Sequence, residues 1–187
     1  MSTSEFSKSM IAQGMKDLLK KQTLESISIG DLARHCNVSR STIYYHFKDK
    51  YDIISWIFHS EILPIVRADK QVGSWTDNLL EVCLYLQRNR SFYTKVLHEI
   101  GQNSFTECLI GFCKELILHM FQESQGERVL SRQQIQTICD IYAYGIVGII
   151  TDWSHRGMKT DPTPVVQTIK DLISGDIFQK MVSISEK

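Results

Sequence analysis

Proline, long apolar runs and paired cysteines are all scarce in this 187-residue chain. Only three prolines occur, and no alternation of apolar and polar residues persists, which argues against a β-rich fold. The longest apolar stretch, residues 141–150, is bracketed by Asp140 and Asp152 and is too short for a bilayer, which takes about 20 residues. The first residues are polar and do not form a signal peptide. We therefore expect a cytoplasmic protein with no membrane partner.

Sequence patterns of metal sites and enzymes are also missing. The five cysteines are odd in number and form no Cys-x-x-Cys pair, as expected of reduced thiols in a cytoplasm. No His-x-x-x-His pair occurs, so we expect neither a metal nor a cofactor. Cys113 with His98 or His119 could be imagined as nucleophile and base, but no orienting group or glycine-rich phosphate loop accompanies them. We therefore do not expect an enzyme.

The chain has no net charge, but its charged residues are distributed unevenly between the N-terminal part and the remainder. The 21 Lys and Arg residues equal the 21 Asp and Glu residues, so the whole molecule is not a polycation. Up to Lys50, however, eight cationic residues face five acidic ones, while the remainder has 13 against 16. This modest asymmetry fits a nucleic-acid-binding module followed by a second domain.

Apolar residues recur at helical spacing almost everywhere, which predicts an all-α protein. The expected helices cover about 5–21, 29–36, 40–46, 49 to 64 or 66, 75–87, 90–98, 103–122, 131–156 and 163–181. We expect two domains: a three-helix helix-turn-helix DNA-binding domain at 1–48 and a helical effector-binding and dimerisation domain at 49–187.

The second and third helices have clear start signals. Ser28, followed by Asp31 three residues later, predicts a variant capping box. Asn37 tolerates left-handed geometry, and Ser39 can cap the next helix. Two short helices joined by a three-residue turn form a helix-turn-helix, whose second helix enters the DNA major groove.

The predicted second helix of this motif carries a polar face suited to DNA. Arginine can bind guanine through two hydrogen bonds, and hydroxyls and aromatic rings can contact phosphates or a thymine methyl. A merely solvated amphipathic helix is the alternative, which the capped preceding helix and the trailing Lys48-Asp49-Lys50 make less favoured. The predicted DNA-binding residues are Ser28, Ser39, Arg40, Ser41, Thr42, Tyr44, Tyr45, His46 and Lys50.

The run Val38-Ser39-Arg40-Ser41-Thr42-Ile43-Tyr44-Tyr45-His46-Phe47-Lys48-Asp49-Lys50 resembles the DNA-binding domain of the TetR family of bacterial regulators. The resemblance implies an all-helical homodimer that binds double-stranded DNA. It also implies that Ser28 lies near a phosphate and that Arg40 and Thr42 face bases or adjacent phosphates. Tyr44, Tyr45 and His46 would then contact the DNA backbone or a thymine, and Lys50 a phosphate.

Two positions depart from this pattern, which puts the preferred operator in doubt. Gly30 stands where some family members carry a base-reading cation, and Ser41 replaces a frequent Gly or Pro.

Resemblance beyond Lys50 is more scattered. Trp75, Tyr85, Phe92-Tyr93-x-Lys95 and Trp153-x-x-x-Gly157 are similar to the subgroup that includes the activator of dihydroxyacetone kinase genes. This similarity implies control through a protein partner in place of a small ligand.

Two further sets of residues are expected in the C-terminal domain. An effector pocket between helices is predicted from aromatic residues, with plain core packing as the alternative. Its members are Tyr85, Phe92, Tyr93, His98, Phe112 and Tyr142. The last two long helices are predicted to pair with a second copy as a four-helix seam, with burial inside one chain as the alternative. Its members are Ile146, Ile149, Ile150, Trp153, Val165, Ile169, Leu172 and Ile173.

These patterns predict a homodimeric transcription regulator on a palindromic operator, with DNA affinity controlled through the C-terminal domain by an unknown small-molecule or protein effector. Repression is the common outcome that the resemblance implies. The alternatives are an activator controlled by a protein partner and a helical adaptor that does not bind DNA.

Overall fold

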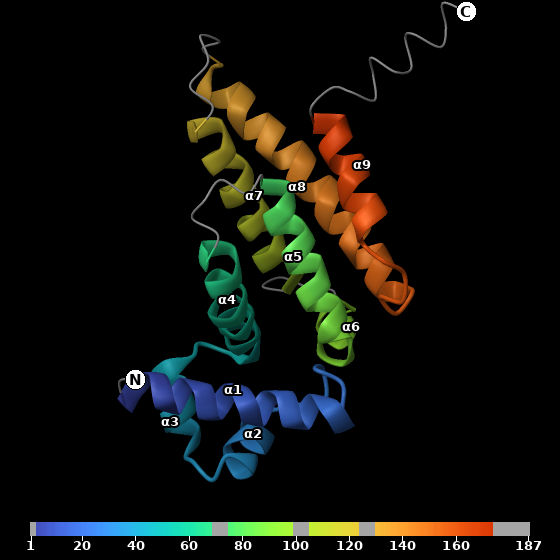
Figure 1. Cartoon of the computed structure of the whole chain (residues 1–187). Coiled ribbons are helices and arrows are strands. Elements are labelled where there is room, and N and C mark those ends of the chain that lie inside the picture. Colours follow the sequence, from blue (N-terminus) through green and yellow to red (C-terminus); the bar gives the residue numbers. More distant parts are fainter. Residues whose placement is uncertain (1–2, 69–74, 99–104, 124–129, 174–187) are drawn as a thin grey trace, which may run out of the picture.

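A computed structural model describes residues 3–68, 75–98, 105–123 and 130–173 of the chain (Figure 1). Every regular element within these ranges is a helix, which confirms the all-α prediction. The helices are α1 (Thr3–Lys21), α2 (Ile29–His35), α3 (Arg40–His46), α4 (Lys50–Ala68), α5 (Trp75–Arg88), α6 (Arg90–Leu97), α7 (Phe105–Glu123), α8 (Arg132–His155) and α9 (Thr163–Ile173). No helix among the described residues is long and apolar enough to cross a membrane.

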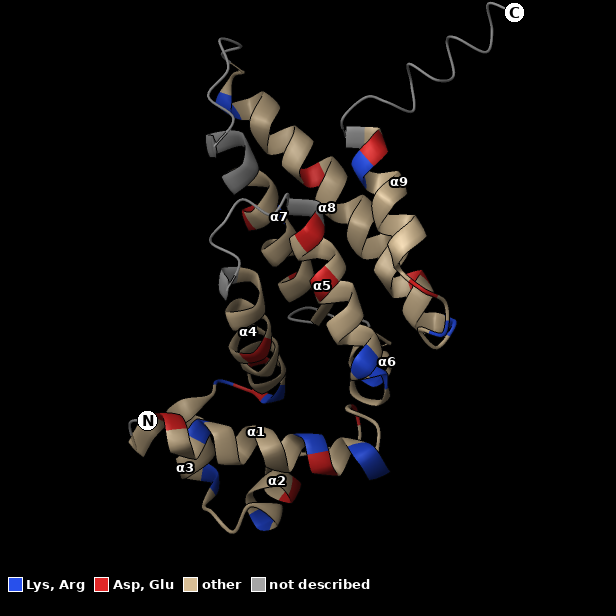
Figure 2. Ribbon diagram, viewed as in Figure 1, with Lys and Arg blue, Asp and Glu red and all other residues tan. Residues whose placement is uncertain are grey.

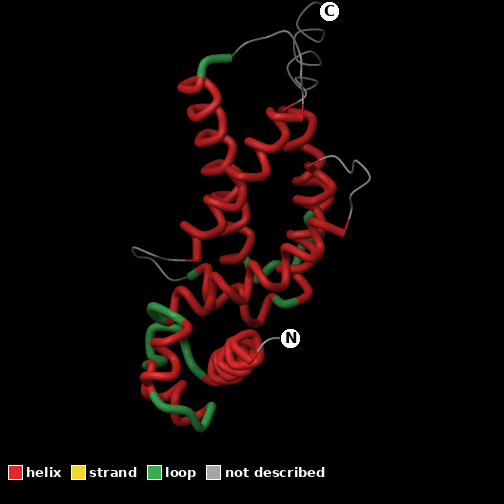
Figure 3. Tube along the Cα trace, turned by 90° about the vertical axis from the view of Figure 1, so that its left-hand side faces the viewer, coloured by secondary structure: helices red, strands yellow, loops and turns green. Residues whose placement is uncertain are grey.

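The helices form two groups. Helices α1–α3, the N-terminal unit, lie at one end of the molecule, and α4–α9, the C-terminal bundle, extend away from them (Figures 1 and 3). Helix α1 lies across the near end of the bundle, with α2 and α3 on its far side. Helices α7 and α8 pack together most extensively, and α9 packs on α5. The predicted domain boundary at residue 48 remains a prediction.

One apolar core runs through both groups because their helices are amphipathic. Helix α1 buries Ile11, Met15 and Leu19 on one face, at the spacing of a helical stripe. Helix α4 contacts α1 as well as α5 and α7, and it buries Ile57 and Phe58 completely or nearly so. Helix α4 therefore links the outer helices mechanically to the bundle.

Most predicted helix ends lie within two residues of the observed ones, and two need comment. Helix α4 continues through Pro64 to Ala68, where the sequence suggested an end at Pro64 or Val66. Because Pro64 is exposed, the carbonyl of Ser60, which loses its helical donor, remains open to water. The predicted extension of the last helix over 174–181 lies outside the described residues.

Candidate nucleic-acid interface

Helix α2 begins with the predicted capping box. The Ser28 hydroxyl oxygen accepts a hydrogen bond from the Asp31 backbone N–H at 3.1 Å, and the Ser28 N–H donates to Asp31 Oδ2 at 3.0 Å. The Ser28 hydroxyl also donates to Asp31 Oδ2 at 2.5 Å. This bond and the one from the Ser28 N–H stabilise the carboxylate and hold the pKa of the Asp31 carboxyl below its usual value. The box leaves Ser28 exposed at the start of α2, where the N-terminal end of a helix favours a phosphate.

The turn after α2 has the geometry that its sequence predicts. Asn37 adopts a left-handed conformation with a φ of 54°, and the Val38 N–H donates to the Ala33 carbonyl at 3.0 Å. Ser39 then caps α3, because its hydroxyl oxygen accepts a hydrogen bond from the Thr42 N–H at 3.0 Å. The turn therefore fixes the angle at which α3 leaves α2.

Helix α3 buries one narrow edge and exposes the rest. Ile43 and Phe47 are buried, and the Phe47 ring packs edge-on against Trp56 of α4, with centroids 6.0 Å apart. Tyr44 and Tyr45 are 57% and 83% exposed, which leaves two large rings unburied at the outer end of the molecule. Rings that no core requires are available for contact with another molecule.

The small polar side chains of this face are already ordered. The Ser39 hydroxyl lies 2.8 Å from both the Ser41 and Thr42 hydroxyls, and the His46 ring packs edge-on against Tyr45, with centroids 4.9 Å apart. The structure therefore places Ser39, Arg40, Ser41, Thr42, Tyr44, Tyr45 and His46 on or beside one short helix. Figure 2 shows Lys and Arg residues on each of α1, α2 and α3.

Arg40 lies against the backbone of Gly30. A Cβ atom at Gly30 would lie only 2.6 Å from Nη2 of Arg40 and 3.1 Å from its Cζ. The glycine that departs from the family pattern therefore makes room for the guanidinium of a residue on the next helix.

Lys50 has a different place from the one expected. Its ammonium donates to three backbone carbonyls of the segment before α2: Leu24 at 2.7 Å, Glu25 at 2.9 Å and Ile27 at 3.3 Å. An ammonium has three hydrogens to donate, so these bonds occupy them all. Lys50 ties the start of α4 to the N-terminal unit, and a phosphate would have to displace one of these carbonyls.

A second set of polar contacts joins α1 to the bundle. Lys16 pairs with Glu61 of α4, and the Tyr85 hydroxyl of α5 donates to the same carboxylate. Lys95 of α6 donates to the Leu19 carbonyl and, at 3.3 Å, to that of Gln22, so that a cation caps the C-terminal end of α1. This junction could not be predicted from the sequence, because no local pattern indicates which distant carboxylate a lysine meets.

The six aromatic residues predicted to line an effector pocket lie in different surroundings. Phe112 packs edge-on against Phe58 with centroids 5.2 Å apart, and Tyr93 contacts Phe58 and Tyr85. Phe92 is buried too, whereas His98 is exposed beside His155 at the end of α6, and Tyr142 is half-buried on α8. Ring-to-ring packing makes these aromatic residues mainly part of the core. Phe92 and Tyr93 also border a small hollow whose other lining includes Lys16 and Glu61. Burial raises the pKa of Tyr93 far above its usual value.

The predicted dimer residues divide into two groups. Ile146, Ile150 and Ile169 are buried within the chain, and Trp153 is half-buried. Ile149, Val165 and Leu172 are exposed, and the side chain of Ile173 lies outside the described residues. Two further exposed residues of α8, Ile141 and Tyr144, extend the apolar stripe and were not predicted.

Comparison with known proteins covers both groups of helices. Residues 14–55 match the family described as "Bacterial regulatory proteins, tetR family", and residues 73–175 match "Transcriptional regulator C-terminal region". The HTH-type dhaKLM operon transcriptional activator DhaS of Lactococcus lactis subsp. lactis (strain IL1403) is 28% identical over 158 residues, 84% of either chain. The HTH-type transcriptional regulator AcrR of Shigella flexneri is 44% identical over 124 residues, 65% of this chain but only 52% of AcrR.

Solved structures of similar proteins share the fold. The dihydroxyacetone kinase operon activator DhaS superposes with a TM-score of 0.64 at 23% identity, over 91% of this chain and 96% of DhaS. The fatty acid degradation regulator FadR of Bacillus halodurans gives 0.60 at 14% identity, over 94% and 96%. Both family matches and the similarity to DhaS confirm the resemblance inferred from the sequence. The chain belongs to the TetR family of bacterial transcription regulators.

Proposed function

We propose that this regulator acts in the cytoplasm as a homodimer that binds a palindromic DNA operator through α3. The exposed polar and aromatic face of α3 carries the proposal, because two tyrosines and an arginine there serve no core. In this arrangement Arg40 reads a guanine edge or an adjacent phosphate, and Tyr44 and Tyr45 contact the sugar-phosphate backbone or a thymine methyl.

The exposed apolar stripe on α8 and α9 supports a dimer. Ile141, Tyr144 and Ile149 are 64%, 58% and 43% exposed on α8, and Val165 and Leu172 are exposed on α9. Contiguous apolar surface of this kind marks an interaction site. Gly145 and Gly148 lie on the same side of α8, and a Cβ atom at either would meet nothing within 4 Å. The stripe therefore offers a surface on which the backbone of a second copy can approach closely.

A twofold pair matches the symmetry of a palindrome. Two recognition helices enter successive major grooves when they lie about 34–36 Å apart. The junction formed by Lys16, Glu61 and Lys95 joins α1 to the bundle, so a change in the bundle alters the position of α3 relative to its twofold mate. A signal in the C-terminal bundle regulates DNA affinity by favouring one of these two arrangements.

Repression is the outcome that we propose first, because a dimer that covers its operator blocks access to it. Activation is the second candidate, and the observation that favours it is the similarity to DhaS, whose name describes a transcriptional activator. Reporter expression measured with and without the protein distinguishes the two outcomes: a repressor lowers expression and an activator raises it.

Selection of random-sequence DNA tests the proposal. The regulator should enrich a palindrome whose half-site centres are one helical turn apart. Tyr45→Ala should weaken binding to the selected site at least about tenfold, while the matched variant Leu118→Ala, also an exposed apolar residue but on α7, should bind normally. A protein that enriches no sequence would be a helical adaptor, and the proposal would then be wrong.

A further inference from the structure

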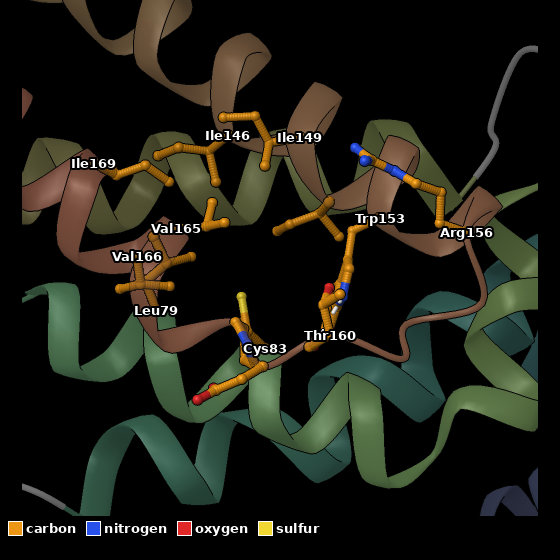
Figure 4. A pocket seen from close by; sticks show the side chains of 13 residues that line it. Leu79, Cys83, Ile146, Ile149, Trp153, Arg156, Thr160, Val165, Val166 and Ile169 are labelled. Carbon is orange, nitrogen blue, oxygen red and sulfur yellow. Dashed lines mark hydrogen bonds between the residues drawn. The ribbon is translucent and has the colours of Figure 1, made fainter.

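A cavity of about 140 Å³ lies between α5, α8 and α9. Figure 4 shows the side chains of Cys83, Ile146, Trp153 and Val166 converging on it from all three helices. Cys83, Ile146 and Val166 are each at most 5% exposed, so the inner wall is already removed from water. This cavity involves none of the six aromatic residues from which an effector pocket was predicted.

Polar groups at one end of the cavity are already hydrogen-bonded. The Trp153 indole N–H donates to the Thr160 carbonyl at 3.2 Å. Asp161 Oδ1 accepts hydrogen bonds from the backbone N–H and the hydroxyl of Thr163, at 2.9 and 2.7 Å. Arg156 pairs with Asp152. A polar guest or a water would find few free partners there, and a buried water needs two to four.

The charged groups at this end already have partners, because Arg156 pairs with Asp152 and Asp161 Oδ1 accepts two hydrogen bonds from Thr163. The guanidinium of Arg156 and the carboxylate of Asp161 both border the cavity. The Cys83 thiol faces the other side, and burial raises its pKa to about 12, so it adds no charge at neutral pH. An uncharged guest therefore loses the least on leaving water.

The volume of the cavity limits the size of the ligand. An apolar protein cavity of about 150 Å³ stays dry and takes up a molecule of the size of benzene. We propose that the 140 Å³ cavity between α5, α8 and α9 binds one compact, uncharged apolar molecule of this size.

This inference rests on the proposed function: binding in the cavity can change the arrangement of the dimer and so its affinity for DNA. Ile149 and Val165 border the cavity and also belong to the exposed stripe proposed for the dimer. A guest that fills the cavity supports both side chains from behind, so it biases the distance between the two copies. Its effect on DNA affinity follows from its different affinity for the two arrangements.

Toluene, with benzoate as its charged counterpart, tests the site on the full chain. Titration followed by calorimetry and by methyl NMR should show saturable binding of one toluene per chain, with shifts at Ile146, Val166 and Ile169. Benzoate should bind at least about tenfold more weakly, because its carboxylate loses water and Arg156, the only cation among the described residues that border the cavity, is already paired with Asp152. Absence of saturable toluene binding, or equal binding of benzoate, would overturn the proposal.

Cys83→Leu fills the cavity and should weaken toluene binding by about tenfold or more, since each lost methylene-sized contact is worth about fourfold in affinity. Cys113→Leu is the matched control, because Cys113 is equally buried but does not border the cavity. Should Cys83→Leu fail to fold, Cys83→Ala gives the opposite change, a shift of preference from toluene to propylbenzene. Equal losses in both leucine variants, or no shift of preference in Cys83→Ala, would contradict the site.

Further outcomes distinguish failure of the proposed cavity from failure of the proposed function. Binding that occurs only after the dimer is diluted into monomers would show that a side chain of the second copy occupies the cavity, and the proposal would be wrong. Toluene binding by a protein that selects no operator would count against the proposed function alone. Operator selection without toluene binding would count against the cavity alone.

Discussion

The substitution Gly30→Ala isolates the role of the Arg40 guanidinium. The new Cβ atom would lie 2.6 Å from Nη2 and 3.2 Å from Nε of Arg40, whereas carbon atoms in good contact lie about 3.5–4.0 Å from their neighbours. The guanidinium must therefore move by about 1 Å. Because it is the end of a flexible side chain, it can do so without disturbing the core.

We expect this substitution to change DNA preference while preserving the fold. Alanine in place of glycine within a helix stabilises a protein by roughly 0.5–1 kcal/mol. An arginine that binds a guanine through two hydrogen bonds is worth about 1–3 kcal/mol of discrimination, or roughly 5- to 150-fold in affinity ratio. Urea unfolding should therefore show unchanged or higher stability, while competition between operator variants should show a loss of preference at one base position.

Matched variants make the reasoning refutable. Gly111→Ala adds a methyl group that meets nothing within 4 Å on α7, so it should match the gain in stability and leave DNA preference unchanged. In an Arg40→Ala background, Gly30→Ala should have no further effect on preference, because the group that it displaces is gone. An unchanged operator preference in Gly30→Ala, or a loss of more than about 1 kcal/mol in stability, would show that this account of Arg40 is wrong.

Three further predictions concern stability, assembly and pH. Lys50→Met removes three hydrogen bonds from a charged donor, so urea unfolding should show a loss of about 1.5–3 kcal/mol; an unchanged stability would leave Lys50 to phosphate binding alone. Ile149→Lys places a charge in the exposed stripe and should shift sedimentation from dimer to monomer, and an intact dimer would exclude this face. Because the pKa of Asp31 is lowered on folding from 3.8, its contribution to stability is present above that pH and lost as pH falls through the lower folded value. Acid unfolding of Asp31→Asn should lack this component, and an unchanged acid profile would contradict the capping box.

The parts of the interface that depend on neighbouring residues were predictable from the sequence. Ser28 and Ser39 cap their helices as predicted, and Asn37 takes the left-handed conformation that its side chain tolerates. Such features arise from hydrogen bonds that reach only three or four residues along the chain. The same holds for the buried edge of α3, where Ile43 and Phe47 lie four residues apart on one side of the helix.

The parts that depend on distant residues were not predictable. Lys50 meets carbonyls more than 20 residues away, and Lys95 meets the end of α1 from more than 70 residues away. Aromatic residues at helical spacing are compatible with either a core or a pocket, and the ring packing of Phe58, Tyr93 and Phe112 decided for the core. The cavity depends on how α9 lies on α5, which no single segment encodes.

The lysine hydrogen bonds that hold α1 and the segment before α2 have a consequence for protein engineering. Lys50 and Lys95 both come after residue 48, yet their ammonium groups hold backbone oxygens of Leu24 and Leu19. A hybrid regulator spliced at residue 48 would therefore lose both lysines together with the C-terminal domain. Grafting this DNA-binding head onto a foreign sensor would succeed only where the recipient supplies amines at the same two places.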